Sequence, residues 1–128
     1  MGRTTGLLQK GYTATTAIPA HRIMKFGAAD GTVVPATDGS AFLVGVQAEL
    51  DCAIGERASA TMIGNIEDVT FGGNVARGDP ITSDASGRAI KAVPAAGANV
   101  FCLGFAEVSG VVGDIGTAII APFIMQGA

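Results

Sequence analysis

Residues 73–92, GNVARGDPITSDASGRAIKA, combine glycine, aspartate, serine, arginine and lysine as phosphate and metal sites do. The second half of this segment, ITSDASGRAIK, also has the pattern of strand, turn and strand. Asp84 can cap a type I turn through its side chain, and Gly87 can take the left-handed conformation that closes a bulged hairpin. The dipeptide Asp79-Pro80 fixes the backbone before the first strand. We therefore interpret the segment as a β-hairpin and its small polar residues as turn residues.

The rest of the chain repeats this pattern of short apolar runs separated by Asp-Gly and glycine-rich turns. Helical periodicity is weak, so the sequence predicts an all-β domain. Two of the runs are AFLVGVQ (residues 41–47) and NVFCLGFAEV (residues 99–108). Alternation predicts that three large residues of each run share a face: Phe42, Val44 and Val46 in the first, and Phe101, Leu103 and Phe105 in the second. Both faces of the second run are apolar, which places it between core layers or between subunits.

The composition is poor in charge, with 15% charged residues in 128, against about 25% in typical domains. So few charges suggest that part of the surface is buried in an assembly. Up to Ala29 the chain has four basic residues and no acidic one; from Asp30 it has four basic and eleven acidic residues, a net charge of −7. An acidic body argues against a nucleic-acid partner, because phosphate contacts need clustered Lys and Arg.

The sequence also argues against a membrane partner and against secretion. No segment reaches the ~20 apolar residues that a membrane-spanning helix needs, and Met1 is followed by polar residues, so no secretory signal is expected. The two cysteines, Cys52 and Cys102, fit no metal spacing and are predicted to be buried free thiols. Free thiols indicate synthesis in a reducing cytoplasm.

The first thirteen residues are predicted to form an extended N-terminal arm, and residues 14–128 a single β-rich domain. The arm contains basic and large apolar side chains that would have no role in a solvated tail: Arg3, Leu7, Leu8, Lys10 and Tyr12. On an arm that orders against an acidic partner, these residues would be anchors. They are our candidate residues for an interface with another protein.

No catalytic or cofactor-binding set is recognisable, and the sequence predicts neither an enzyme, a cofactor nor a metal site. The phosphate-binding pattern Gly-x-x-x-x-Gly-Lys-Ser/Thr is absent. His21 is the only histidine, is expected to open a strand, and has no neighbouring nucleophile motif. Glu67 and Asp68 are neighbours in an expected strand, so their side chains would point to opposite faces. Arg77-Gly78-Asp79 matches the adhesion tripeptide, but the hairpin accounts for Gly78 and Asp79.

Four strings carry a resemblance to known proteins, and together they cover most of residues 14–122: IPAHRIMKFGAADGTVVPAT, VGVQAELDCAIGERASA, GNVARGDPITSDASGRAIKA and GFAEVSGVVGDIGTAIIAP. The most specific piece is RGDPITSDASGRA with GFAEVSG downstream. The chain resembles the capsid cement, or decoration, proteins of tailed phages and prophages. Pattern and resemblance together predict an all-β, small barrel- or sandwich-like (β-tulip-type) domain of short strands with an extended N-terminal arm.

The resemblance implies a non-catalytic protein on the outer surface of the phage head, made in the bacterial host cytoplasm. It would bind the major capsid protein, bridge neighbouring capsid subunits and stabilise the shell against internal DNA pressure. It would assemble with itself into a trimer or, alternatively, a dimer. Two other hypotheses remain open: a monomeric β-barrel module that binds a sugar or peptide, and an enzyme whose site forms across subunits around His21 or the acidic residues.

Overall fold

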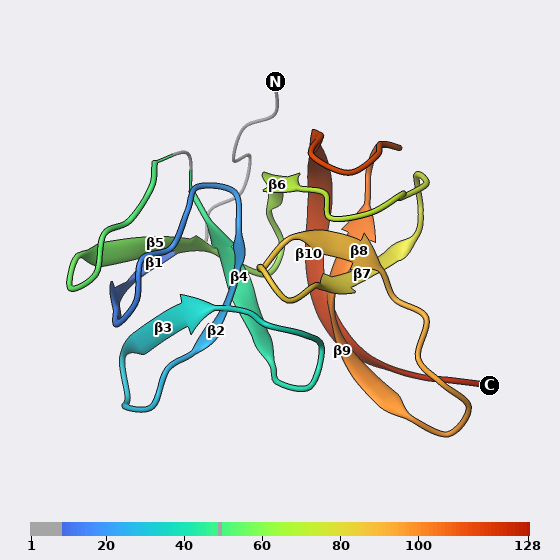
Figure 1. The fold of residues 1–128 in the computed structure, drawn as a ribbon, viewed down its shortest axis with the longest axis horizontal. Helices are drawn as coiled ribbons and strands as arrows, with labels where there is room; N and C mark the ends of the chain where they lie inside the picture. The colour runs from blue at the N-terminus through green and yellow to red at the C-terminus, as the bar shows by residue number, and fades with distance from the viewer. Residues whose placement is uncertain (1–8, 49) are drawn as a thin grey trace.

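The computed structural model describes residues 9–48 and 50–128, and these contain ten β-strands and no helix (Figure 1). The first five strands close into a barrel in the order β1-β3-β2-β4-β5. In chain order their bounds are Gln9–Ala14, Ile23–Phe26, Thr32–Pro35, Leu43–Gln47 and Arg57–Thr61. Strands β1 and β3 are parallel, and the other barrel pairs are antiparallel. The all-β, barrel-like prediction is confirmed.

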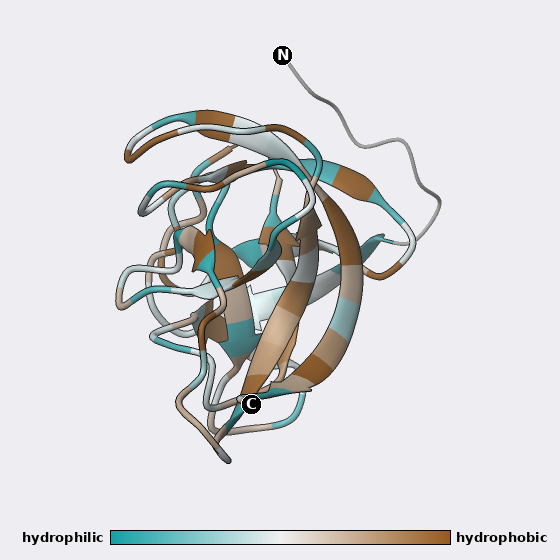
Figure 2. Cartoon of the chain, turned by 90° about the vertical axis from the view of Figure 1, so that its right-hand side faces the viewer, coloured by the Kyte–Doolittle hydropathy of each residue, from teal (hydrophilic) through white to brown (hydrophobic). Residues whose placement is uncertain are grey.

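The other five strands form a second sheet in the order β6-β10-β9-β7-β8, with antiparallel pairing throughout. Strands β6 to β10 span Ile66–Thr70, Pro80–Ser83, Ala89–Lys91, Asn99–Ala106 and Ile115–Gln126. Phe71, directly after β6, bridges to Ala89 in β8, which brings the two edges of this sheet together. Figure 1 shows the barrel and the second sheet side by side, and Figure 2 looks at the molecule from the side of the long strands β9 and β10.

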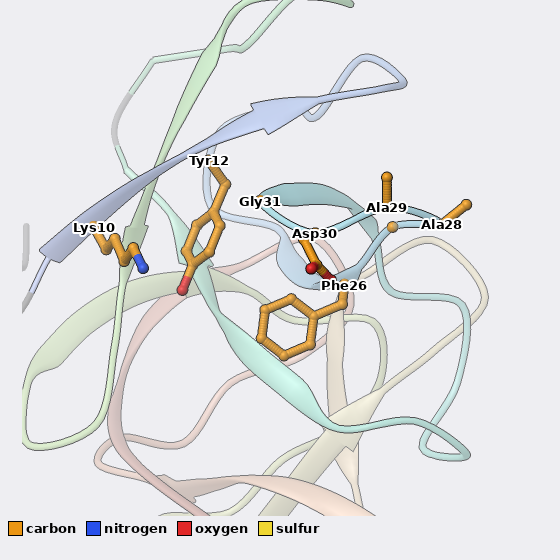
Figure 3. Close-up of a pocket in the computed structure, with 8 residues that line it drawn as sticks. Lys10, Tyr12, Phe26, Ala28, Ala29, Asp30 and Gly31 are labelled. Atoms are coloured by element: carbon orange, nitrogen blue, oxygen red, sulfur yellow. The ribbon is translucent and has the colours of Figure 1, made fainter.

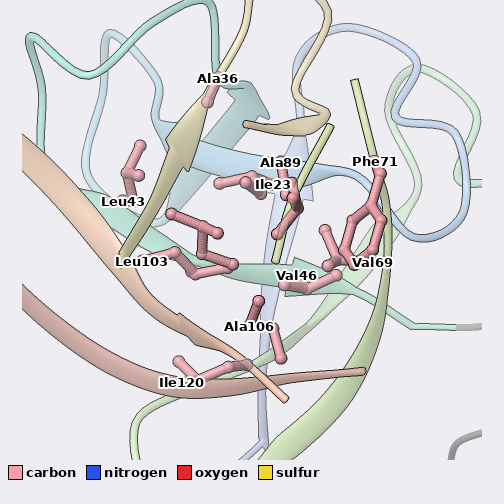
Figure 4. Close-up of a cluster of buried hydrophobic side chains, with 13 residues drawn as sticks. Ile23, Ala36, Leu43, Val46, Val69, Phe71, Ala89, Leu103, Ala106 and Ile120 are labelled. Atoms are coloured by element: carbon pink, nitrogen blue, oxygen red, sulfur yellow. The ribbon is translucent and has the colours of Figure 1, made fainter. Parts of the chain in front are cut away.

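Two hydrophobic clusters hold this arrangement together. One fills the barrel and includes Met24 and Val44. The other lies between the barrel and the second sheet, where Ile23 and Val46 from the barrel meet Phe71 and residues of β7, β9 and β10 (Figure 4). Neighbouring residues of β2 thus point into different clusters, as alternation along a strand requires. Strand β4 supplies both clusters and is buried along its whole length.

A β-bulge in β4 changes which side chains share a face. On β2, Met24 pairs with Gly45 and Lys25 with Leu43, so Val44 has no partner there. Val44 therefore points into the barrel while Val46 points into the shared cluster, and Phe42 is 42% exposed. The predicted common face of Phe42, Val44 and Val46 is wrong, because a bulge breaks the two-residue period.

A second bulge, in β10, has the same effect on the neighbouring strand β9. Leu103 stands opposite the unpaired residues Ala121 and Pro122 of β10, and proline within a sheet is confined to such sites because it has no N–H to donate. The next residue, Gly104, has φ 155, and a Cβ there would collide with the carbonyl oxygen of Ile119. As a result Leu103 is fully buried and Phe105 is 38% exposed, so they do not share a face as predicted.

The predicted hairpin of residues 81–91 is confirmed. Asp84 Oδ1 accepts hydrogen bonds from the backbone N–H groups of Ser86 (2.8 Å) and Arg88 (2.9 Å), and Oδ2 pairs with Arg88 Nε at 3.0 Å. Gly87 has φ 77, the expected left-handed conformation. Its carbonyl accepts a hydrogen bond from Ile23 N at 2.7 Å, which fixes the hairpin to the barrel. Asp79 Oδ2 accepts from Ala76 N at 2.9 Å, so the preceding turn is capped in a similar way.

The barrel begins earlier in the chain than the sequence suggested. Residues 9–13, assigned to the arm, form most of β1, which pairs with β5 from Gln9 opposite Thr61 to Thr13 opposite Arg57. A run of small and polar residues can form this strand because β1 is held by backbone hydrogen bonds on both sides. An arm that ends before Gln9 remains a prediction, since residues 1–8 lie outside the described part of the chain.

The hairpin turn predicts a specific loss of stability for Asp84→Ala. This change removes two acceptor bonds to backbone N–H groups and one ion pair, and we expect the free energy of unfolding to fall by about 1–3 kcal/mol. Denaturant titration followed by circular dichroism measures this. The exposed Asp30 serves as the control, because Asp30→Ala should change the free energy by less than about 0.5 kcal/mol. Equal effects of the two changes would contradict the assignment.

Candidate interaction surfaces

Four aromatic rings form a continuous run from the barrel to the second sheet. Tyr12 in β1 meets the edge of Phe26 in β2, with ring centroids 6.0 Å apart. Phe26 stacks on Phe42 at 6.0 Å, and Phe42 meets the edge of Phe101 in β9 at 6.4 Å. Phe26 is 50% exposed and Phe42 is 42% exposed, whereas Tyr12 is buried. The run therefore offers two large apolar rings to a partner on a rigid base.

A surface pocket of about 460 Å³ lies at the Tyr12 end of this aromatic run (Figure 3). Its lining comes from β1, the end of β2 and the turn that follows: Lys10, Tyr12, Phe26, Gly27, Ala28, Ala29, Asp30 and Gly31. Lys10 Nζ lies 5.3 Å from the centroid of the Tyr12 ring, within the range of a cation–π interaction. The Tyr12 hydroxyl donates to Met62 Sδ at 3.9 Å. The pocket thus combines two aromatic rings with one side chain of each charge.

The structure brings together two of the five predicted interface residues, Lys10 and Tyr12, at this pocket. Tyr12 is 6% exposed and belongs to the barrel cluster, so it supports the pocket as a core residue. Arg3, Leu7 and Leu8 lie outside the described residues. A contact between these five residues and a partner remains a prediction.

Sequence reasoning missed the exposed rings of Phe26 and Phe42. The run AFLVGVQ predicts Phe42 on one face with Val44 and Val46, and Phe26 ends the apolar run HRIMKF, so both are expected in core strands, the usual place for phenylalanine. One signal was available: each lies at the end of its run, Phe26 before Gly27 and Phe42 directly after Ser40-Ala41. An aromatic residue at a strand end beside turn residues lies at the rim of a sheet, where one side of the ring can meet solvent.

Comparison with known proteins identifies the family. The sequence matches the phage cement protein family over residues 5–114. The chain belongs to this family. Family membership gives the protein a structural role on the phage capsid and a place in the virion, in agreement with the resemblance of its sequence.

A solved structure shares the fold. The structure of the head fiber gp8.5 N base of bacteriophage phi29 superposes with a TM-score of 0.66 and 18% sequence identity, covering 89% of this chain and 93% of the phi29 chain. At this identity the likeness concerns the fold alone. No curated protein is significantly similar in sequence.

The side chains of this cement protein do not form a recognisable reactive cluster in the part of the chain described. No group of three or more His, Cys, Asp and Glu side chains gathers there, and no helix there is long and apolar enough to cross a membrane. His21 lies in a turn with φ 64 and does not open a strand as predicted. Its backbone N donates to Gln47 O at 3.1 Å and its carbonyl accepts from Thr70 N at 2.9 Å, so it links β4 to β6.

Two acidic residues of β6 are buried but point to opposite sides of the sheet. Glu67 stands opposite Ala118, a core residue, and Asp68 stands opposite Thr117. Glu67 is 1% exposed, and its carboxylate accepts hydrogen bonds from Thr61 Oγ1 and Asp68 N, both at 3.0 Å. The prediction that Glu67 and Asp68 do not face each other is confirmed. Glu67 acts within the fold as an acceptor that joins β6 to β5.

Both cysteines of the cement protein are free and buried, as predicted. Burial raises the pKa of the Cys52 thiol, with a further contribution from the Glu56 carboxylate, and burial alone raises the pKa of Cys102. A raised pKa lowers the fraction of thiolate, the reactive form, at any given pH. The two residues therefore serve as small apolar side chains.

These thiols should be unreactive in the folded protein. We expect neither Cys52 nor Cys102 to react with the disulfide reagent DTNB at pH 8 in native buffer, and both to react after unfolding in denaturant. The absorbance of the released thiolate measures this. Cys52→Ser, which leaves Cys102 as the single thiol, is the control for the stoichiometry. Rapid labelling of the native protein would show that one site opens to solvent and would contradict the burial.

Proposed function

We propose that the protein is a cement protein of the outer head surface, which binds the major capsid protein and bridges neighbouring capsid subunits. By holding subunits together it stabilises the shell against internal DNA pressure. It acts without catalysis or a cofactor, and does so as a homo-oligomer, a trimer or alternatively a dimer. It is made in the cytoplasm of the bacterial host and uses neither nucleic acid nor membrane as a partner.

The proposal places the capsid contact on a particular surface because the rings of Phe26 and Phe42 are exposed there. Surface phenylalanines that are both stacked and about half exposed are typical of the centre of a protein interface, where aromatic residues are enriched. Lys10 and Asp30 flank the rings at the pocket and supply charges that set orientation. Arg3, Leu7 and Leu8 precede β1 in the sequence, and the proposal assigns them to the same contact as a basic and apolar arm.

Modest contact in each copy is sufficient because the copies act together. Fully burying a phenylalanine contributes about 1.5–3 kcal/mol, so burying the exposed halves of Phe26 and Phe42 contributes roughly that amount in total. An oligomer engages several capsid subunits at once, and after the first contact the others form at high effective concentration. The oligomer is then expected to bind the capsid lattice strongly, although each copy binds a free capsid subunit weakly.

Co-sedimentation with mature heads that lack the protein tests the aromatic surface. The double change Phe26→Ser and Phe42→Ser is expected to raise the concentration for half-saturation by about tenfold or more, because the apolar contact is lost. Val93→Ser is the matched control, since Val93 is 77% exposed and lies outside the aromatic run. Thermal melting should show that both proteins remain folded.

The same experiment separates the competing functions. Saturation of heads at a fixed ratio of copies per capsid subunit supports lattice-specific cement. No binding by a folded monomer would overturn the proposal and favour the sugar- or peptide-binding module. Binding that is unchanged in the double variant would remove the aromatic run from the interface.

Deletion of residues 2–8 tests the arm. The deletion stops before Gln9, because β1 is part of the barrel, so the fold should persist with an unchanged circular dichroism spectrum. Head binding is expected to weaken, since Arg3, Leu7 and Leu8 are removed, and the salt dependence of binding should decrease with the loss of one basic residue. A deletion variant that saturates heads at the wild-type concentration and salt sensitivity would show that the arm has no part in binding.

A further inference from the structure

We propose that the outer face of the second sheet is the surface on which copies of this chain pack against one another. This inference deepens the oligomeric part of the proposed function by naming the surface. It concerns a row of apolar residues that crosses four strands, on the side of the sheet opposite the shared core. We call this row, with the ring that stacks on it, the outer patch: Ile66, Pro80, Phe105, Ile119 and Phe123.

The strand register sets this row. Ile119 in β10 stands opposite Ile66 in β6 and also opposite Phe105 in β9, and Phe105 stands opposite Pro80 in β7. Residues opposite one another in an antiparallel pair lie on the same face. Phe123 stacks on Phe105, with ring centroids 5.2 Å apart and planes at 12°. The neighbouring residues Ala118 and Ile120 are buried in the shared cluster, so the outer patch faces away from the core.

The part of the outer face that β9 and β10 form lacks the charges that keep a solvated sheet in water. Neither β9 nor β10 contains a charged residue, although one face of an antiparallel sheet is normally polar when it meets solvent. Brown bands recur along both long strands in Figure 2. Ile119 is 41% exposed and Phe105 is 38% exposed. Phe105 points outward although Leu103 is buried, because the backbone changes direction at Gly104 (φ 155), opposite the bulge of β10.

The area fits an interface between folded copies. Ile115, four residues before Ile119 in β10, extends the outer patch and is 56% exposed. Together with the patch it exposes on the order of 400 Å² of apolar surface, a size that marks interaction sites in soluble proteins. A standard interface buries about 800 Å² per partner, of which roughly 60% is apolar. The patch therefore supplies about the apolar share that a stable pair of copies needs.

The charges beside the patch complement one another. Next to Ile119 along β10, Thr117 lies between Asp68 and Glu107, and its hydroxyl donates to Glu107 Oε1 at 2.6 Å. The backbone N of Arg77 donates to Ser109 Oγ at 2.9 Å, which places this exposed arginine at the same end of the sheet. Within residues 9–48 and 50–128 the one ion pair is Asp84–Arg88, so Arg77 is available to a neighbour. Arg77 of one copy can meet Glu107 of the next.

A second copy fits this face better than a capsid subunit does. Interfaces between permanently associated copies are the more apolar class, whereas surfaces that meet a partner later are more polar. An uncharged patch of this size would promote aggregation if it stayed open while the protein waits to bind a head. The aromatic run with Lys10 and Asp30 has the mixed polarity of a surface that is recruited later. The outer patch therefore serves assembly, and the aromatic run stays free.

Sedimentation equilibrium of the purified full chain tests the assignment without heads. The wild-type protein is expected to be an oligomer of fixed number at micromolar concentration. Ile119→Asp should weaken association by about 30-fold or more, because it buries an unpaired charge at the centre of the interface. Ile54→Asp is the matched control, since Ile54 is 69% exposed in a barrel loop, and it should associate like the wild type. A monomeric wild type, or a folded Ile119→Asp protein with unchanged association, overturns the proposal.

If the Ile119→Asp variant fails to fold, reversing the charges of Arg77 and Glu107 provides a second test of the surface. Arg77→Glu alone should weaken association several-fold, and adding Glu107→Arg should restore it, because the pair is then reversed. Loss without restoration overturns the arrangement. Head binding separates this inference from the proposed function. If a monomer still saturates heads, only the proposed surface for self-association is overturned. If a stable oligomer does not bind heads, only the proposed cement function is overturned.

Discussion

The double burial of β4 is the constraint on which the rest of the structure depends. This strand belongs to the barrel and also packs against the second sheet, so its side chains contribute to two separate hydrophobic clusters. A strand with both faces buried needs apolar residues throughout, and LVGVQ provides four of five. The last residue, Gln47, donates through Nε2 to Leu50 O at 2.9 Å, which satisfies its amide nitrogen at the strand end.

The glycines that follow β9 are explained by the same shared cluster. The Phe71 ring is fully buried there, and a Cβ at Gly110 or Gly116 would come within 2.6 Å of its atoms. The loop GVVGDIG thus presents bare backbone to an aromatic ring. The first and last glycines of this segment, Gly110 and Gly116, therefore serve ring packing.

Local features of the fold could be predicted from the sequence, and features that depend on distant pairing could not. The Asp84–Gly87 turn was predictable because every group in it lies within a few residues of its partner. The side on which Val44 or Phe105 lies depends on a bulge, and a bulge forms between strands that are far apart in sequence. Tyr12 was assigned to an arm for the same reason: its strand is defined by pairing with β5, more than forty residues later.

The candidate surfaces were accordingly less predictable than the fold class. The low charge content indicated that some surface is buried in an assembly, but composition does not tell which residues form that surface. Only the register of β6, β10, β9 and β7 places Ile66, Ile119, Phe105 and Pro80 in one row. Likewise, Lys10 and Tyr12 were singled out as isolated residues, while Phe26 joins them through a contact between β1 and β2 that no local pattern encodes.

In the proposed assembly, each of the two surfaces has its own role and its own chemistry. A cement protein has to remain soluble while free and yet bind a lattice tightly. An uncharged apolar sheet face meets the first demand when a second copy covers it, because the face is then buried before any head is present. The aromatic run meets the second demand, because two exposed rings with flanking charges bind weakly in one copy and strongly in several. Under this proposal the low charge content has a single cause, namely that much of the surface of the isolated chain is interface.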